Sequence, residues 1–271
     1  MSDRVTCTIE GGVADVRLNR PEKMNALDPA MFAGLVDTGE ALKNNPSVRA
    51  VVLSGEGRAF CAGLDFGNFQ QMAGDAPRRD GNGVGRIGDT DGRITHLGQQ
   101  AAWVWMEMAV PVIAAVHGVA LGGGCQIAMG ADLRYVRPDA QFSVLEIRWG
   151  LTPDMSITAL LPQLVGLDIA KELTFTGRMV SGEEAVRIGL ATKVCEDPLA
   201  DALALASEIA AKSPHAVRGA KQLLNMSGRV SLAEQFEKER SVIGALIGSP
   251  NQVEAVKAFF EKRPANYADP S

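Results

Sequence analysis

The sequence predicts an α/β fold, on three observations. Residues 49–53 and 111–116 are continuous apolar runs of the kind found in strands that are buried on both faces. Amphipathic segments alternate with these runs. The chain is also long enough, at 271 residues with 46% hydrophobic and 22% charged residues, to bury a large core. We expect this α/β core over residues 1–197 and a C-terminal helical region over residues 198–271.

The N-terminal part alternates strands with one clear helix. Residues 5–18 alternate in character around Glu10-Gly11-Gly12, which predicts a β-hairpin. Asp28 followed by Pro29 predicts the start of a helix that runs to about residue 42, with Asp28 as its N-cap. The apolar strand at residues 49–53 comes next, and Ser54-Gly55-Glu56-Gly57 ends it in a turn.

Residues 67–98 interrupt this pattern. The segment is polar and rich in Gly and Asp, so we expect a long mobile loop, which inside a compact domain is usually functional. It contains Gly83-Val84-Gly85-Arg86-Ile87-Gly88, a formal match to the dinucleotide-binding fingerprint. No strand is predicted before that match, because Pro77-Arg78-Arg79-Asp80 stands where the strand would have to be. The sequence therefore argues against nicotinamide chemistry.

The second half returns to strands and then becomes helical. Strands are predicted at residues 111–116, 133–136 and 140–144, and Ser181-Gly182-Glu183-Glu184 has the pattern of a capping box that opens a short helix to residue 188. Four amphipathic helices complete the chain, with apolar residues at spacings of three and four: residues 199–212, 214–226, 232–247 and 252–262.

Composition limits the class of partner. The net charge is −5 and the pI about 5.3, which argues against a nucleic-acid partner, since such a partner requires a basic face. No apolar signal core and no apolar run of membrane-spanning length is apparent, so we expect a cytoplasmic location and no membrane partner. The four cysteines lie apart in apolar surroundings without metal-ligand spacing, which predicts reduced core thiols and no metal site.

Two glycine-centred segments carry the main functional signal. Phe60-Cys61-Ala62-Gly63-Leu64-Asp65 follows a predicted strand, and Leu121-Gly122-Gly123-Gly124-Cys125-Gln126 joins a strand to the start of a helix. Glycines let a ligand approach the backbone closely, and the first turn of a helix has unpaired N–H groups with a partial positive charge. Two such amides that converge on one point would form an oxyanion hole.

Through these segments the chain resembles the crotonase superfamily, the enoyl-CoA hydratases and isomerases. The likeness also includes residues 18–27, 131–135, 142–150, 176–178 and 181–190, in the family's order and spacing. It implies a spiral of ββα units that binds an acyl-CoA thioester, with the thioester carbonyl oxygen between the amides of Leu64 and Gly123. Coenzyme A is then part of the substrate, and no separate cofactor is expected.

The resemblance also implies how the rest of the chain is used. The helical tail of such proteins packs against neighbouring subunits, which implies a homo-oligomer here, either a trimer or a dimer of trimers. Residues 67–98 correspond to a region that borders the acyl pocket, which implies a lid.

The candidate proton-moving groups are Gln126, Glu146 and Asp154. Hydratases of the family hold a water between two glutamates, but the first of those positions is Gln126 here, and an amide cannot act as a general base. The second is Glu146. Asp154 matches an aspartate that dienoyl-CoA isomerases pair with the glutamate to move a proton along the acyl chain. The alternatives are that Asp154 caps a helix over residues 155–164 and that Glu146 is a surface carboxylate.

The remaining site residues follow from the same likeness. It implies that six residues bind substrate or CoA, the last of them across a subunit contact: Lys23, Ala26, Ala62, Asp65, Gly122 and Lys262. Arg20 is a further candidate for the CoA phosphates. A structural interpretation stays open for the charged residues, with Asp65 as a cap that holds its turn and the cations as solvated surface charge.

Three functions remain open at this point. Double-bond isomerisation of an enoyl-CoA or dienoyl-CoA through a thioester enolate fits the residues best. The nearest alternative is an enoyl-CoA hydratase of fatty-acid β-oxidation that uses Glu146 with a water held by Gln126. A catalytically silent CoA-binding subunit is the third, although such a subunit would have no need of the two amides and Glu146.

Overall fold

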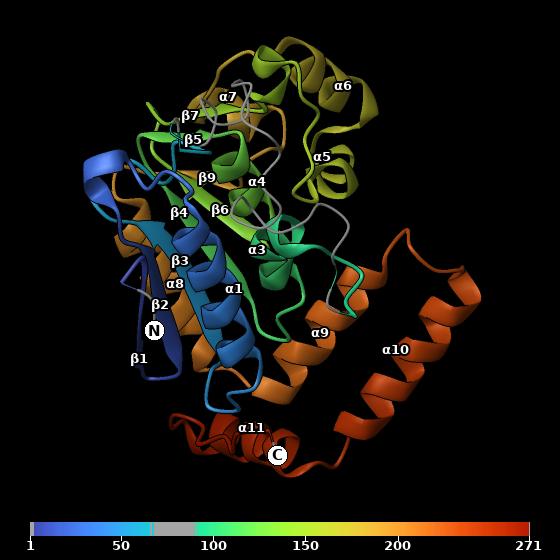
Figure 1. The fold of residues 1–271 in the computed structure, drawn as a ribbon. Coiled ribbons are helices and arrows are strands. Elements are labelled where there is room, and N and C mark those ends of the chain that lie inside the picture. The colour runs from blue at the N-terminus through green and yellow to red at the C-terminus, as the bar shows by residue number, and fades with distance from the viewer. Residues whose placement is uncertain (1–2, 66, 68–89, 91, 271) are drawn as a thin grey trace.

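A six-stranded, largely parallel sheet forms the centre of the molecule (Figure 1). The computed structural model describes residues 3–65, 67, 90 and 92–270. The strand order is β1-β2-β3-β4-β6-β9, with β1 and β2 antiparallel and the other neighbours parallel. The strands are β1 Val5–Glu10, β2 Val13–Leu18, β3 Ala50–Gly55, β4 Val112–Val116, β6 Leu133–Val136 and β9 Lys193–Val194. The predicted α/β class and hairpin are confirmed.

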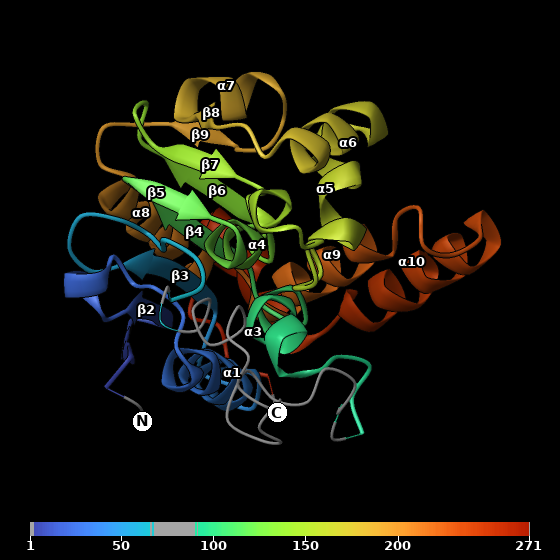
Figure 2. The same cartoon turned by 45° about the horizontal axis from the view of Figure 1, so that its top comes forward.

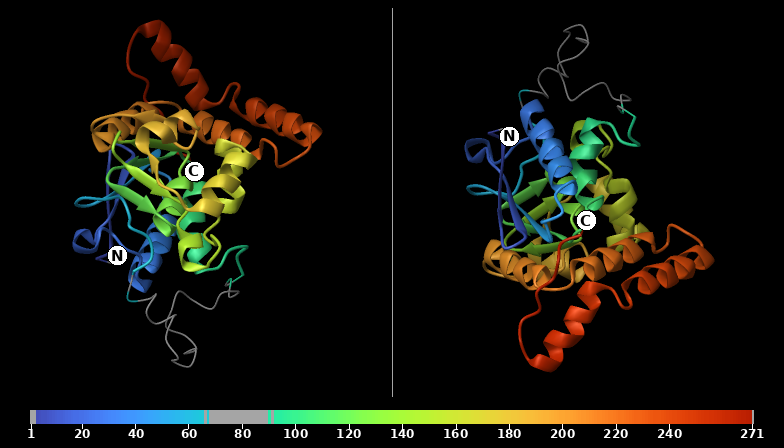
Figure 3. Two further views of the ribbon diagram at one scale, coloured as in Figure 1. Left: turned by 90° about the horizontal axis from the view of Figure 1, so that it is seen from above. Right: turned by 90° about the horizontal axis from the view of Figure 1, so that it is seen from below.

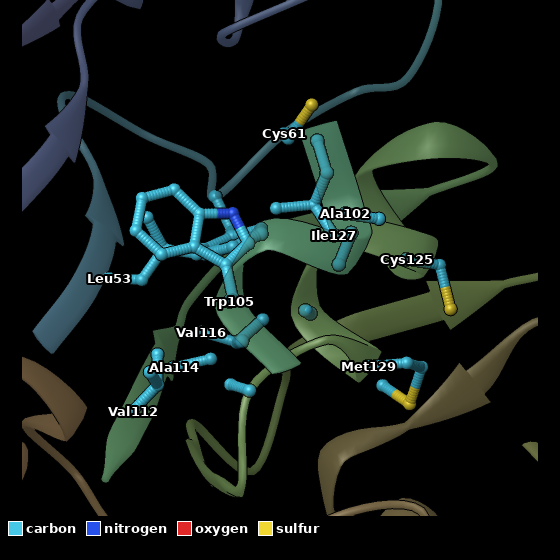
Figure 4. Packing of buried hydrophobic residues seen from close by; sticks show 14 of the residues in the cluster. Leu53, Cys61, Ala102, Trp105, Val112, Ala114, Val116, Cys125, Ile127 and Met129 are labelled. Carbon is cyan, nitrogen blue, oxygen red and sulfur yellow. The ribbon is translucent and has the colours of Figure 1, made fainter. Parts of the chain in front are cut away.

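Both faces of this sheet are buried, as the continuous apolar runs predict. Val51 and Leu53 of β3 point to a core shared with α1 (Pro29–Lys43) and α3 (Leu97–Met106). The alternate residue Val52 points to the opposite face, where α8 (Pro198–Ala210) covers the sheet with small alanine side chains. Figure 4 shows the first of these cores, with the wholly buried Trp105 close to Leu53 and Ile127.

A second, three-stranded sheet lies beyond the end of the first. It has the order β5-β7-β8, with β5 at Val119–Leu121, β7 at Gln141–Ser143 and β8 at Val180–Ser181. Helix α4 (Gly123–Met129) begins immediately after β5, as Figure 2 shows. A parallel bridge between Cys61 and Ala120 joins the segment after β3 to this sheet. The two glycine segments are thereby brought next to each other.

The remaining helices lie outside the two sheets. They are α5 Ile157–Val165, α6 Leu167–Thr176, α7 Gly182–Arg187, α9 Pro214–Met226, α10 Leu232–Leu246 and α11 Pro250–Glu261. Figure 3 shows α10 and α11 extending away from the rest of the chain. The four predicted C-terminal helices are present, but α8 packs on the central sheet rather than with the others. Within the described residues, no helix is both long and apolar enough to cross a membrane.

The segment at residues 67–98 is described only in part. The dinucleotide-fingerprint match at residues 83–88 and most of the predicted lid lie outside the described residues. The predicted loop extends two residues too far, because α3 already begins at Leu97. His96 caps this helix by accepting a hydrogen bond from the Gly98 N–H at 3.1 Å, which accounts for that histidine without a catalytic role.

Asn25 joins the two loops that precede the first glycine segment. Its side chain is fully buried, and Nδ2 donates to the carbonyls of Glu56, Ala59 and Phe60 at 2.9, 2.8 and 3.2 Å. Oδ1 accepts from the Arg20 N–H at 2.8 Å. The backbone of Asn25 has a φ of 56°, a left-handed conformation that Asn tolerates better than most residues. The loop after β2 is thus fixed against the loop after β3.

Replacing Asn25 by Ala should lower the free energy of unfolding by about 2–4 kcal/mol, because three carbonyls lose a donor in a buried place. Urea unfolding at a fixed protein concentration measures the change. Asn44→Ala is the matched control, since the Asn44 amide is exposed and donates only to the Glu40 carbonyl, and it should cost less than about 1 kcal/mol. Equal losses for the two variants would contradict the role given to Asn25.

Candidate active site

The two glycine turns face each other across a close backbone contact. Gly63 has a φ of 86°, and a Cβ built on it would lie 2.6 Å from the Leu121 carbonyl oxygen and 3.8 Å from the Gly123 nitrogen. Only glycine fits this position. Among the described residues, the N–H groups of Leu64 and Gly123 have no hydrogen-bond acceptor. The fold therefore presents two free amides on facing turns.

An ion pair between Arg20 and Asp65 fixes the first turn. Arg20 donates to the Asp65 carboxylate at 2.6 Å and to the Ala26 carbonyl at 3.0 Å. The other Asp65 oxygen accepts from the Gly67 N–H at 2.8 Å, and this contact, followed by the Arg20 contact, lowers the pKa of Asp65. Arg20 and Asp65 hold the turn that carries Leu64, which is the structural interpretation of Asp65.

Glu146 lies beside the second turn. It opens a short 3-10 helix, Glu146–Trp149, that follows β7, and its Oε1 atom is 3.2 Å from where a Cβ on Gly122 would stand. Oε1 accepts a 2.6 Å hydrogen bond from Gln126 Nε2. Oε2 is buried and has no hydrogen-bond partner among the described residues. Glu146 is thus a half-buried carboxyl aimed into the site rather than a surface carboxylate.

Burial is the main reason that the pKa of Glu146 is raised. The nearby backbone N–H of Glu146 itself and the hydrogen bond from Gln126 act in the opposite direction, and the negative charge of Asp154 raises the pKa further. A carboxyl with a raised pKa is suited to take and return protons near neutral pH. A perturbed carboxyl beside free amides is also a typical sign of an active site.

Gln126 is completely buried on α4. Its Oε1 accepts from the Met155 N–H at 2.9 Å, while its Nε2 donates to Glu146. Met155 in turn lies against the second glycine turn, since a Cβ on Gly123 would be 2.9 Å from its Sδ. The Gln126 amide therefore links the Glu146 carboxyl to Met155, which packs against Gly123.

Asp154 is exposed and does not cap the next helix. Helix α5 begins at Ile157 rather than Met155, and its N-cap is Ser156 with a φ of 74° and no side-chain cap. The capping interpretation of Asp154 is therefore wrong, because the chain makes one more left-handed turn before the helix starts. Asp154 remains close enough for its charge to act on Glu146.

The other predicted binding residues are divided between two places. Ala26 is buried, the Ala62 N–H donates to the Met24 carbonyl at 2.9 Å, and Gly122 has a φ of 50° as the N-cap residue of α4, so these three shape the turns. Lys23 is exposed on the loop after β2. Lys262 is the C-cap residue of α11, which lies at the bottom of Figure 1 and away from α4, so it is not brought to this site within one chain.

The roles of Asn25 and Met155 were not predicted from the sequence. Neither residue offered a local signal, because each acts through contacts with residues that are distant in the sequence. The cysteines beside the turns agree with the prediction of core thiols: burial raises the pKa of Cys61 and of Cys125 to about 12. Neither thiol is suited to be a nucleophile at neutral pH.

Comparisons with known proteins point to one family. Residues 8–270 match the family model described as enoyl-CoA hydratase/isomerase. The chain is 34% identical over 261 residues to a crotonyl-CoA hydratase of Syntrophomonas wolfei, covering 95% of each. It is 35% identical over 255 residues to the mitochondrial Delta(3,5)-Delta(2,4)-dienoyl-CoA isomerase of Rattus norvegicus, covering 93% of this chain and 77% of that one.

A solved structure agrees with these relatives. The fold superposes on an enoyl-CoA hydratase from Bacillus anthracis with a TM-score of 0.86 and 28% identity, covering 97% of this chain and 98% of the other.

The raised pKa of Glu146 predicts a pH-dependent stability. A carboxyl whose folded-state pKa is raised favours folding while it is protonated, and this contribution is lost as pH rises from the ordinary glutamate range, about 4.3, through the raised value. Glu146→Gln should therefore raise Tm by a few degrees at pH 8, with the gain shrinking toward pH 4.

Thermal unfolding followed by circular dichroism across this pH range measures the effect. Glu10→Gln, at an exposed position on β1, is the control and should leave Tm unchanged. A Glu146→Gln variant that is less stable than the wild type at pH 8 would argue against a costly buried carboxylate.

Proposed function

Because this chain belongs to the enoyl-CoA hydratase/isomerase family, we propose that it moves a double bond along the acyl chain of an enoyl-CoA or dienoyl-CoA. That it is an enzyme acting on acyl-CoA follows from the family and its named relatives. The reaction itself is our inference from the site. In this reaction the amides of Leu64 and Gly123 form the oxyanion hole, and Glu146 and Asp154 transfer the proton.

The observation that carries this proposal is the amide at position 126. Hydration that uses two carboxylates needs an acid and a base on either side of one water. Here Glu146 instead receives a hydrogen bond from Gln126 Nε2, and Gln126 Oε1 is already occupied by the Met155 N–H. Isomerisation adds no water, and it needs only groups that remove a proton from one carbon and deliver one to another.

The positions of the two carboxyls suggest their order of use in a 3,5-dienoyl-CoA. Glu146 lies next to Gly122 and so beside the thioester, where it would remove a proton from C2. The electrons of the broken C–H bond pass into a trienolate that extends from the thioester oxygen to C6, and this oxygen accepts from the two amides. Asp154 would then deliver a proton to C6, which leaves double bonds at C2 and C4. Exchange with solvent returns the proton from Glu146 to Asp154.

A hydratase activity is the second candidate. The Syntrophomonas wolfei relative is named a crotonyl-CoA hydratase, and its similarity covers nearly all of this chain. Such an activity would use Glu146 alone on a water. Gln126 could orient that water with its second Nε2 hydrogen or the second lone pair of its oxygen, but it offers no group that titrates. We therefore place hydration below isomerisation.

CoA would lie across the exposed loop that carries Lys23, and the turns at Ala26, Ala62, Asp65 and Gly122 would support the thioester end. No cofactor beyond the CoA of the substrate is proposed. A cytoplasmic location remains a prediction of the sequence alone.

We further propose that the chain assembles as a trimer or a dimer of trimers. Helix α10 has no buried residue within the described chain, and it exposes an apolar stripe at Leu232, Phe236 and Ile243, which Ile247 continues at the C-cap. These residues recur at spacings of four and seven, on one face of the helix. Lys262 would reach the CoA of a neighbouring subunit in such an assembly.

Glu146→Gln should reduce turnover of a 3,5-dienoyl-CoA by about 10²- to 10⁴-fold, because it removes the titrating group and keeps the shape. Asp154→Asn should reduce it to a lesser degree. Ultraviolet absorbance of the conjugated product measures turnover, and calorimetry should show unchanged acyl-CoA binding. A wild type that hydrates crotonyl-CoA faster than it isomerises any dienoyl-CoA would favour the second candidate.

Replacing Phe236 and Ile243 together by Asp should prevent assembly, since two charges would stand in the apolar stripe. Light scattering before and after the change gives the molar mass. Glu237→Gln, on another face of α10, is the control and should leave the oligomer intact. A monomeric wild type would remove this part of the proposal.

A further inference from the structure

We propose that Gln126 is a positioning residue that gives the two oxygens of Glu146 different tasks: Oε1 is held as a permanent hydrogen-bond acceptor, and Oε2 alone carries the proton during turnover. This inference rests on the proposed function, in which Glu146 is the group that removes a proton. The buried, neutral amide of Gln126 determines which oxygen of Glu146 carries the proton.

The orientation of the Gln126 amide is fixed by its neighbour. The Met155 N–H can only donate, so the amide atom 2.9 Å from it must be the oxygen. Nε2 must then face Glu146, 2.6 Å from Oε1. The side chain is completely buried, so water does not compete for either contact. The hydrogen-bond chain thus has one direction, from the Met155 N–H through Gln126 to Glu146.

This direction determines the proton position on Glu146. An oxygen that accepts an N–H donor is favoured as the carbonyl oxygen of a protonated carboxyl, because a hydroxyl oxygen is the weaker acceptor. The acidic proton therefore belongs on Oε2. Oε2 is buried and lacks a donor among the described residues, so its negative charge is poorly stabilised while it is ionised. Protonation of Oε2 therefore removes the negative charge that is least stabilised in the Glu146 carboxyl.

Packing keeps this arrangement aligned with the oxyanion amides. Oε1 is enclosed by Gln126 and by the backbone at Gly122, where a Cβ would come within 3.2 Å of it. Met155, the donor to Gln126, also has its Sδ 2.9 Å from where a Cβ on Gly123 would stand. A shift of the Gly123 turn would therefore move Met155 and, through Gln126, the carboxyl. The base and the enolate-binding amide are held as one unit.

The reaction step balances on these atoms. Ionised Oε2 forms an O–H bond with the C2 proton, the C–H electron pair forms a C1–C2 double bond, and the π pair of the thioester carbonyl moves onto its oxygen. When C6 takes up a proton, that pair returns to re-form the carbonyl, and double bonds form at C2–C3 and C4–C5. Oε1 keeps its hydrogen bond from Gln126 throughout. A glutamate at position 126 would instead place two carboxyl oxygens in contact, and these would have to share a proton. The Gln126 amide avoids that shared proton.

Gln126→Leu tests this role. It removes the donor to Oε1, so Glu146 should stay protonated to higher pH than in the wild type. On the acidic side of the pH profile, the fall in kcat/KM should then occur at a higher pH than in the wild type. The value of kcat should fall about 10- to 100-fold, because the Glu146 carboxyl is no longer held in place. Difference infrared titration of the ligand-free protein reads Glu146 directly, with Glu146→Gln to assign the carboxyl band. Acyl-CoA affinity should change less than about 2-fold.

Two further variants keep the test decisive. Gln100→Leu is the matched control, because Gln100 is a buried amide that donates to Glu40 and Glu107 at 2.9 Å each, and it should leave the Glu146 titration unchanged. Gln126→Glu keeps the size of the side chain and the acceptor for the Met155 N–H, and it guards against a leucine variant that does not fold. It should give two coupled carboxyl titrations in place of one.

The inference is overturned if Glu146 titrates as in the wild type in folded Gln126→Leu or Gln126→Glu, or if Gln100→Leu shifts it equally. Failure of the proposed function would look different. A wild type without isomerase turnover would remove that function, whereas the infrared titration would still report whether Gln126 controls Glu146.

Discussion

The site depends on one constraint, the backbone contact between the turn at Gly63 and the turn at Gly122 and Gly123. Any side chain on Gly63 would collide with the Leu121 carbonyl, since its Cβ would lie 2.6 Å away. The contact places the free amides of Leu64 and Gly123 on facing turns. Asn25 and the Arg20–Asp65 ion pair serve this contact by fixing the loops behind it. Rigid support of this kind lets backbone amides stabilise a developing negative charge.

With the two glycine turns held in place, the chemistry depends on the polar groups around Glu146. A half-buried carboxyl, a neutral amide at 2.6 Å and an exposed aspartate nearby are the groups to which we assign proton transfer. The family contains both named hydratases and named dienoyl-CoA isomerases at similar identity to this chain, so overall similarity does not choose between them. Our proposal of isomerisation rests on Gln126, which donates a hydrogen bond to Glu146 from the position where a second base would have to be.

Much of the fold could be predicted from local sequence. Asp28 caps α1, and the runs at β3 and β4 are buried on both faces, because these features depend on neighbouring residues. The start of α5 could not be predicted, since Asp154 after Pro153 has the pattern of a cap while the chain turns again at Ser156. The roles of Asn25 and Met155 were also hidden. They depend on contacts between residues 29 to 35 positions apart, which no local pattern specifies.

The most direct test of the central claim is the reaction of a 3,5-dienoyl-CoA in D₂O, followed by NMR and mass spectrometry. Proton transfer by Glu146 and Asp154 predicts a 2,4-dienoyl-CoA product with deuterium at C6 and no added oxygen. It also predicts that Glu146→Gln produces almost none of it. A product that carries oxygen at C3, or deuterium incorporation that survives Glu146→Gln, would contradict the account.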